Sequence, residues 1–318
     1  MPPLNLSNQA ALQSVLAAME EKRKKIASTQ TNGYLFLGSG ILLFILGASF
    51  NMVVPAVIAA LGPIIYGGIV LYKIDDDLQA YKQAYKRDVI GASLKSINES
   101  LTISPGNGIY ETEFAYTQLF QTTPDRYHSE DLVKGKIDKT AFFFAEVHAE
   151  YKTTTQTKNG TQTQWHDIFK GIIFAADFNK NFTNKMIIRP KYFGSALGSW
   201  LTNVFSSDGG SVVKLENPDF DKAFITYGND QVGSRYILTP MLMERILKLN
   251  DNSKYQISLS FLDSRMYIAF PLDRNYFEAP VFKSLLKMEN LNDDINAINF
   301  MCDIVQELDL NTRIWGKS

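Results

Sequence analysis

Two long runs without a charged side chain constrain this chain more than any other feature. Residues 33–50 and 52–72 contain no Asp, Glu, Lys or Arg, and Asn51 alone separates them. Twenty-one helical residues, the length of the second run, extend about 31 Å, roughly the thickness of a bilayer's hydrocarbon core. Two adjacent runs of this kind are hard to bury in a soluble domain of this size. The sequence therefore predicts a transmembrane helical hairpin over 33–72, with a pair of buried soluble helices as the alternative.

The charges that flank the two runs predict the orientation of the hairpin. Basic residues precede the first run and follow the second, and none lies between the runs: Lys22, Arg23, Lys24, Lys25, Lys73, Lys82, Lys86 and Arg87. Lys and Arg are enriched on the cytoplasmic side of membrane spans. We therefore expect both termini in the cytoplasm, where a chain with one cysteine and no internal disulfide fits the reducing conditions.

Composition shifts predict four parts along the chain. They are an amphipathic N-terminal helix with the basic cluster (1–32), the hairpin (33–72), a helical stalk (73–104) and a cytosolic domain (105–318). The stalk is predicted from apolar residues at helical spacing after the second run. Pro105 and Gly106 then break the helical pattern.

Three consecutive aspartates follow the second run. In an antiparallel hairpin that turns at Asn51, Lys25 and Asp77 lie at the same height, since each is 26 residues from the turn. We therefore expect a charge collar that pairs the basic cluster Lys22, Arg23, Lys24 and Lys25 with Asp75, Asp76 and Asp77, or a basic cluster that contacts anionic lipid. A solvated charge run is one alternative. Metal or catalytic use is another, disfavoured because consecutive helical positions point around the helix.

The C-terminal region has the pattern of a sheet with helices. Strand-like runs at 141–156 and 161–178 flank Asn159–Gly160, a strong hairpin signal. Further strand-like runs are KMIIRP, SVVKLE, KAFITYG, SRYIL, YQISLSF and RMYIAF. Residues 193–210 interrupt these runs as a loop or short amphipathic helix, and one hypothesis is that this segment contacts the membrane. Helices are predicted after an N-cap at Thr239 and over 292–308, where Cys302 takes a core position. The expected fold is α+β, an antiparallel sheet with at least two packed helices.

Histidines and carboxylates near this hairpin raise the question of a metal site. Glu146, His148 and Glu150 share one face of their strand. If Asn159–Gly160 forms the turn, His148 faces Gly171 and His166 faces Thr153 on opposite faces, so the two histidines cannot bind one ion. The same register pairs Lys152 with Asp167 and Glu150 with Phe169. Ordinary cross-strand pairing is the prediction, and metal binding by Glu146 and His148 with a third group is the alternative.

No linear motif points to a reaction. The sequence lacks nucleophile, zinc and phosphate-loop motifs, and it predicts no catalytic, cofactor-binding or metal-binding residue. Lys and Arg are scattered and the net charge is −1, which disfavours nucleic acid as a partner. Many active sites carry no such motif, so enzymatic activity stays open.

Three segments of the C-terminal region carry a family resemblance. WHDIFKGIIFAADFNKNF (165–182), residues 212–249 and ISLSFLDSRMYIAF with FEAP (257–280) resemble bacterial membrane proteins that contain the domain of unknown function 3137. The resemblance covers about 140–285. It implies a bacterial inner-membrane protein of unassigned biochemistry, LemA-type membrane proteins as candidate partners, and no established catalytic residue. Polar residues of the resembling part form either internal contacts or a recognition patch: Asp177, Asn179, Arg235 and Glu278.

Anchoring and the lack of reaction motifs together favour one function. The leading hypothesis is a non-enzymatic binding or scaffold module at the inner membrane, which acts by localising its partners. The expected partner is another membrane protein. The alternatives are a membrane-associated hydrolase or lipid-handling enzyme, and a regulatory subunit of a membrane complex.

Overall fold

The fold consists of two compact units. In this computed structural model, the described residues are 6–157, 160–178, 185–191, 210–287, 289–308 and 310. The first unit comprises Met1–Ser96 with Phe277–Ile295, and the second comprises Ile97–Tyr276 with Asn296–Ser318. The segment 277–295, which the sequence groups with the C-terminal domain, therefore belongs with the N-terminal helices.

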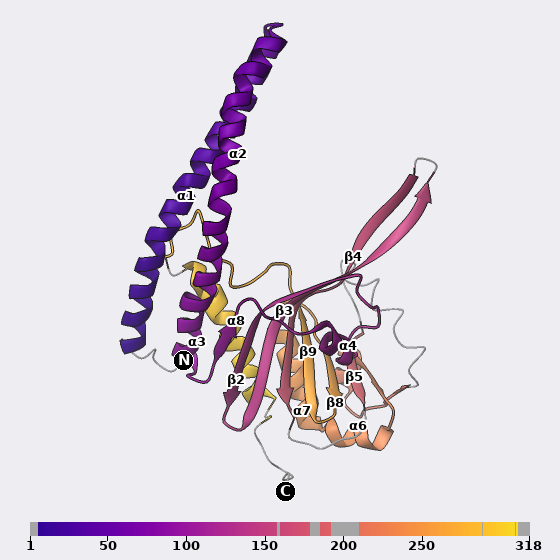
Figure 1. Cartoon of the computed structure of the whole chain (residues 1–318). Helices are drawn as coiled ribbons and strands as arrows, with labels where there is room; N and C mark the ends of the chain where they lie inside the picture. Colours follow the sequence, from indigo (N-terminus) through magenta and orange to yellow (C-terminus); the bar gives the residue numbers. More distant parts are fainter. Residues whose placement is uncertain are drawn as a thin grey trace. The chain divides into compact units, whose positions relative to one another are not determined.

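The first unit is a helical hairpin (Figure 1). Helix α1 (Leu6–Ser49) and helix α2 (Val53–Ala84) run antiparallel, and α2 continues through a π-helical turn, η1 (Tyr85–Ile90), into α3 (Gly91–Ile97). Asn51 adopts a left-handed conformation with φ of 57°, which Asn tolerates better than most residues. A Cβ placed on Gly33 would lie 2.7 Å from a Leu71 methyl carbon, so glycine permits close approach of the helices here. The predicted turn at Asn51 is confirmed.

The two helices expose much of their apolar surface. Both are long and apolar enough to cross a membrane. Large exposed apolar side chains of this stretch include Leu35, Ile41, Leu42, Ile45, Phe50, Val54, Ile58, Ile65, Ile69 and Tyr72. Within the described chain, these residues are therefore not buried in a soluble core, which is the alternative drawn from the sequence.

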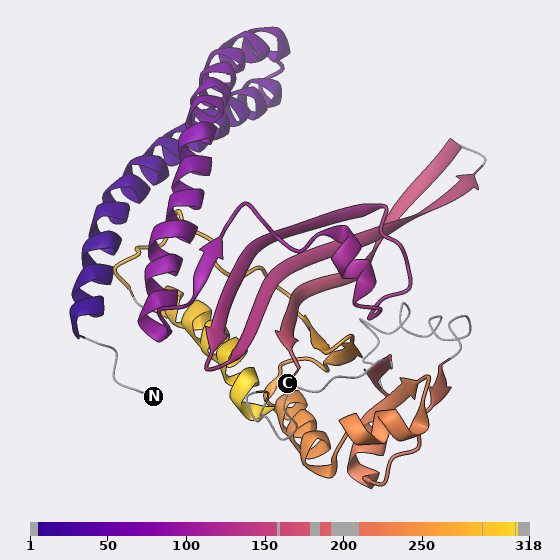
Figure 2. The same ribbon diagram turned by 60° about the horizontal axis from the view of Figure 1, so that its bottom comes forward.

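The second unit is built on an antiparallel sheet of nine strands (Figures 1 and 2). The strand order is β1-β2-β3-β4-β9-β8-β5-β7-β6. The strands are β1 (Thr102–Ser104), β2 (Arg126–Ile137), β3 (Thr140–Thr157), β4 (Gly160–Asp177), β5 (Met186–Pro190), β6 (Ser211–Val212), β7 (Phe224–Gly228), β8 (Ser258–Leu262) and β9 (Arg265–Pro271). The helices of this unit are α4 (Glu111–Tyr116), α5 (Pro218–Ala223), α6 (Gln231–Ile237) and α7 (Pro240–Asn252), together with the part of α8 (Glu289–Glu307) from Asn296 onwards. The predicted α+β class is confirmed.

Alternation along β3 divides the core of this unit between the two faces of the sheet. Ala145, Val147 and Ala149 lie in a buried cluster with Phe114 and Phe120 of the α4 region. A separate set of buried aromatic residues includes Phe142 stacked on Phe174, and Phe270 in edge contact with Phe300 of α8. Both faces of the central strands are therefore apolar along part of their length. One face also carries a polar stretch, which on β3 consists of Glu146, His148 and Glu150.

Two local predictions have different outcomes. Thr239 caps α7 as predicted, since its hydroxyl accepts a hydrogen bond from the Leu242 N–H. The predicted strand at SRYIL is wrong, because these residues lie in and just after α6. The Asp230 carboxylate accepts hydrogen bonds from the N–H groups of Val232 and Gly233 and starts this helix. Short apolar runs are ambiguous between strand and helix, and here the cap decides. The hypothesis about 193–210 falls almost wholly outside the described residues.

Candidate functional site

The pairing of β3 with β4 differs from the predicted register. Thr157 pairs with Gly160, so the connection is one residue earlier than Asn159–Gly160. As a result Asp167 pairs with Glu150 rather than with Lys152. His166 pairs with Tyr151 rather than Thr153, and His148 pairs with Lys170 rather than Gly171. The predicted register is therefore wrong, although the hairpin itself is present.

A β-bulge at Ile168 changes which side chains share a face. Ala149 pairs with Phe169 and Glu150 pairs with Asp167, which leaves Ile168 as an extra residue in β4. Ile168 and Phe169 are both buried. The bulge turns Asp167 to the face that carries His148 and Glu150, the type of redirection for which bulges are used.

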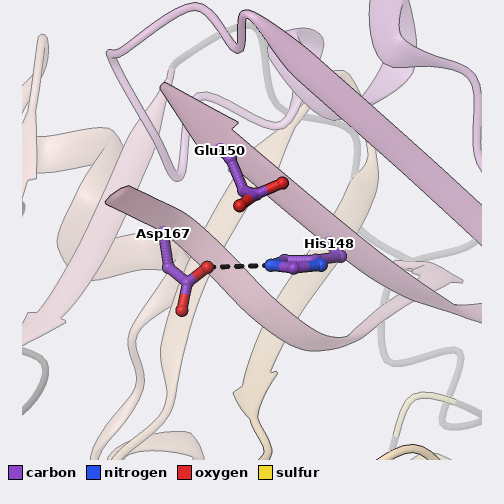
Figure 3. Close-up of side chains that lie close together, drawn as sticks. All are labelled: His148, Glu150 and Asp167. Atoms are coloured by element: carbon purple, nitrogen blue, oxygen red, sulfur yellow. Dashed lines mark hydrogen bonds and ion pairs between the residues drawn. The ribbon is translucent and has the colours of Figure 1, made fainter. Parts of the chain in front are cut away.

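These three side chains converge (Figure 3). The His148 Nε2 atom lies 2.8 Å from Asp167 Oδ1, and one ligand atom from each of His148, Glu150 and Asp167 lies within 4.8 Å of the others. His148 and Glu150 are half-buried, whereas Asp167 is exposed. From the sequence, Glu146 rather than Asp167 is the candidate metal donor beside His148. Asp167 is missed because the bulge that turns it to this face leaves no signal in the local sequence.

Arg126 and Trp165 support Glu150 from the side. The Arg126 Nη1 atom lies 3.1 Å from Glu150 Oε2. The same guanidinium group lies over the Trp165 ring, 3.9 Å from its centroid, at a distance suited to a cation–π contact. One oxygen of Glu150 is therefore held by a positioned cation.

The polar residues continue onto β2 to form what we call the polar face. It consists of Arg126, His128 and Glu130 on β2, Glu146, His148 and Glu150 on β3, and Asp167 and Lys170 on β4. A cavity of about 90 Å³ adjoins it, lined in part by His128, Glu146, His148, Lys170 and Arg274. Glu146 is buried and accepts a hydrogen bond from the Tyr276 N–H. Glu130, Asp131 and Glu146 form a second group of carboxylates close together.

A larger cavity, of about 710 Å³, lies elsewhere in the same unit. Its described lining comes from α4, the chain at 118–124, β5 and β7. Lys185 and Tyr227 are the titratable groups of that described lining, which contains no carboxylate, histidine or cysteine. The described walls of this cavity therefore do not combine an acid with a base.

In the helical unit, the predicted charge collar does not form. Arg23 binds Glu20 at 2.8 Å and Lys24 binds Glu21 at 3.3 Å. Asp75, Asp76 and Asp77 are exposed, and within the described chain no ion pair joins them to the four basic residues. For Arg23 and Lys24 the reason is local, because each pairs with a carboxylate three residues earlier on the same helix. The structure thus matches the alternative of a solvated aspartate run.

A buried polar network, not predicted from the sequence, ties the segment after Phe277 to the helices. The Glu20 carboxylate accepts hydrogen bonds from Arg23, from the Leu285 N–H at 2.9 Å and from the Ser284 hydroxyl at 3.1 Å. Arg23 also donates to the Val281 carbonyl at 2.6 Å, and the Tyr81 hydroxyl donates to the Pro280 carbonyl at 2.8 Å. The hydrogen bond from Arg23 is the largest cause that lowers the pKa of Glu20 to about 2, against the opposing effect of burial.

The residues of the predicted recognition patch have structural partners. Asp177 lies 3.9 Å from Arg265, and Arg235 donates to the Lys214 carbonyl at 3.1 Å. Glu278 lies in the helical unit and binds Lys86 at 3.3 Å. Asn179 lies outside the described residues. These contacts support the alternative of internal roles.

Comparison with known proteins gives one family match and one similar solved structure. Residues 167–310 match the family described as "Protein of unknown function (DUF3137)". No curated protein matches the chain. Among solved structures, the crystal structure of the mycobacterial trehalose monomycolate transport factor A is similar at 9% identity and a TM-score of 0.36, covering 70% of this chain and 94% of that one. The matched segment begins and ends later than the resemblance at about 140–285, and it is similar to the family of the domain of unknown function 3137.

Proposed function

We propose that this protein is a membrane-anchored binding or scaffold module, with α1 and α2 crossing the bacterial inner membrane and both termini in the cytoplasm. The exposed apolar surface of the two helices between residues 34 and 72 carries the proposal. Transfer of a large apolar side chain from water to an apolar medium contributes about 1.5–3 kcal/mol. A surface of this extent is stable against lipid and unfavourable in water.

Polar groups of the two helices suit a lipid environment. The Ser39 hydroxyl donates to the Phe36 carbonyl, and the Ser49 hydroxyl donates to the Ile45 carbonyl. Within a bilayer, polar groups must be satisfied inside the protein in this way. Tyr34 and Tyr72 lie exposed at the outer ends of the two runs, where aromatic residues favour the interface between lipid and water.

The basic cluster supports cytoplasmic termini and contact with anionic lipid. Lys22 and Lys25 are exposed, and no ion pair involves them within the described chain. Each exposed Lys near an anionic leaflet contributes about 1 kcal/mol of attraction. The revised role of Lys22 and Lys25 is therefore contact with lipid head groups rather than pairing with the three aspartates.

A two-stranded ribbon offers a place for a partner. Beyond the pair Glu150–Asp167, β3 and β4 extend together as an arm (Figure 1). In the described pairing, β2 ends opposite Glu150 and β9 ends opposite Gly171, so the arm has no neighbouring strand on either side. Open strand edges accept an extended segment of another protein. We propose another membrane protein as this partner, with LemA-type proteins as candidates from the family resemblance.

Membrane topology can be measured with single cysteines. Burial raises the pKa of Cys302 to about 12, so its thiol reacts little, and Cys302→Ser removes it. In that background we expect Met52→Cys to react with an impermeant maleimide in intact spheroplasts, and Ser318→Cys to react only after the membrane is opened. The protein should also resist extraction with alkaline carbonate. Labelling of Ser318→Cys from outside, or release by carbonate, would overturn the anchoring proposal.

The partner contact can be tested with a photo-crosslinking amino acid at Thr154 on the arm. Thr154 is exposed, and Lys222 of α5 is an exposed control position in the same unit. We expect Thr154 to yield one dominant adduct with a membrane protein in native cells, and Lys222 to yield none of that mass. The same adducts from both positions, or none from Thr154, would contradict a role of the arm in binding.

A further inference from the structure

We infer that His148, Glu150 and Asp167 form a binding site for one divalent transition-metal ion of the zinc class. This goes beyond the proposed function, since it concerns the sheet alone and does not depend on the membrane anchor. The bulge in β4, the charge of the three side chains and their neighbours all support a site here.

The backbone places the three donors in a compact arrangement. His148 and Glu150 are two residues apart on β3, and Asp167 lies on β4 directly opposite Glu150. Zinc binds imidazole nitrogen and carboxylate oxygen at about 2.0–2.2 Å, so ligand atoms around one tetrahedral ion are about 3.3 Å apart. The three ligand atoms already lie within 4.8 Å of one another, and His148 and Asp167 approach to 2.8 Å. To bind an ion, His148 Nε2 and Asp167 Oδ1 would separate from 2.8 Å to about 3.3 Å.

The charge of the group favours a cation. Glu150 and Asp167 form a like-charged pair directly across two strands, and Arg126 offsets only one of these two negative charges. Arg126 binds Glu150 Oε2 from the side away from β4, because it lies on β2. The Oε1 atom of Glu150 stays available to an ion while Arg126 orients the carboxylate, as outer-shell partners do in metal sites.

The donor set and the adjoining space indicate the kind of ion. One imidazole with two carboxylates suits zinc, manganese or ferrous iron rather than copper(I), which prefers thiolate and thioether ligands. Three protein donors leave at least one coordination position open. His148 also lines the cavity of about 90 Å³, whereas Glu150 and Asp167 are not among the described lining residues of that cavity.

Zinc binding to the metal-free full chain in mild detergent tests the inference, with a chromophoric chelator as competitor. We expect one equivalent of zinc to bind, and His148→Ala and Asp167→Asn each to weaken binding at least tenfold. His166→Ala is the matched control, since His166 lies beside Asp167 on β4 but bonds to Thr153 at 2.8 Å and belongs to no described group of metal donors. It should bind zinc like the unchanged protein.

A second readout separates loss of the site from loss of the fold. Zinc should raise the unfolding temperature of the unchanged protein and of His166→Ala, but not that of Asp167→Asn, which keeps the shape of the side chain. Manganese serves as a second probe ion. Absence of stoichiometric binding of either ion, or equal weakening in all three variants, would overturn the proposed site.

Discussion

Glu20→Ala is expected to destabilise the helical unit by about 3–5 kcal/mol, the range found when one partner of a buried ion pair is removed. The change leaves Arg23 buried without its carboxylate and removes the acceptor of the Leu285 N–H. The segment that these bonds hold should detach from the helices. Limited trypsin digestion in mild detergent can detect this, because Lys283 and Lys287 are exposed within the segment. Thermal unfolding of the same sample gives the loss of stability.

Glu21→Ala is the control for this change. Glu21 is the next residue, its side chain is 78% exposed, and it pairs with Lys24 on the surface. Exposed ion pairs contribute about 0–1 kcal/mol, so cleavage after Lys283 should stay as slow as in the unchanged protein. Equal sensitivity of both variants to trypsin would show that the segment is not held by Glu20.

The same network predicts a dependence on pH. The hydrogen bond from Arg23 lowers the pKa of Glu20 from an ordinary value of 4.5 to about 2. A depressed carboxyl pKa adds stability that is complete above about pH 4.5 and is lost as the pH falls towards 2. The protection factor of the Leu285 N–H, which compares its exchange rate with that of a free amide at the same pH, should therefore fall across this window. In Glu20→Gln the protection factor should already be low at neutral pH and change little from this cause.

The sequence predicts the helical hairpin well because its signals are local. Charge-free runs of similar length on either side of Asn51 determine both the turn and the height of each residue. The charge collar is wrong because Arg23 and Lys24 pair with carboxylates one turn earlier on the same helix. Lying at the same height as the three aspartates is not enough to make them pair. The contact of Glu20 with Leu285 joins residues 265 positions apart and leaves no periodic signal. A carboxylate beside the apolar stripe of Leu12, Leu16 and Met19 is the one hint the sequence offers.

In the sheet, the sequence predicts the strands but not the candidate metal site. Alternation and Asn159–Gly160 indicate β3 and β4. The register depends on where the turn falls and on an extra residue at Ile168, and neither changes the local composition. A shift of two places decides whether Asp167 faces Lys152 or Glu150, and hence whether three metal donors meet. Tertiary pairing therefore creates the site from residues that separately look like ordinary surface pairs.

Gly171→Ala is expected to cost about 2–5 kcal/mol in the sheet unit, with contributions from overpacking and from backbone strain. Gly171 has a φ of 156°, which residues with a side chain rarely adopt. A Cβ at this position would overlap the Phe270 carbonyl oxygen and lie 2.9 Å from the Pro271 Cα. These are backbone atoms of β9, and β4 pairs with β9 at both of these residues, so an added Cβ would force the two paired strands apart. Urea unfolding of the full chain, followed by tryptophan fluorescence, gives the change.

Gly106→Ala is the matched control, since a Cβ there meets no atom within 4 Å and its φ lies outside the left-handed region. It should change stability by no more than about 0.5 kcal/mol. Gly171 also follows Lys170, whose carbonyl accepts the Leu272 N–H where β9 ends. Forcing β4 and β9 apart at this point would therefore disturb the wall of the 90 Å³ cavity as well as the sheet. If the two alanine variants unfold at the same urea concentration, the close approach of β4 and β9 at Gly171 does not limit stability, and the glycine needs another explanation.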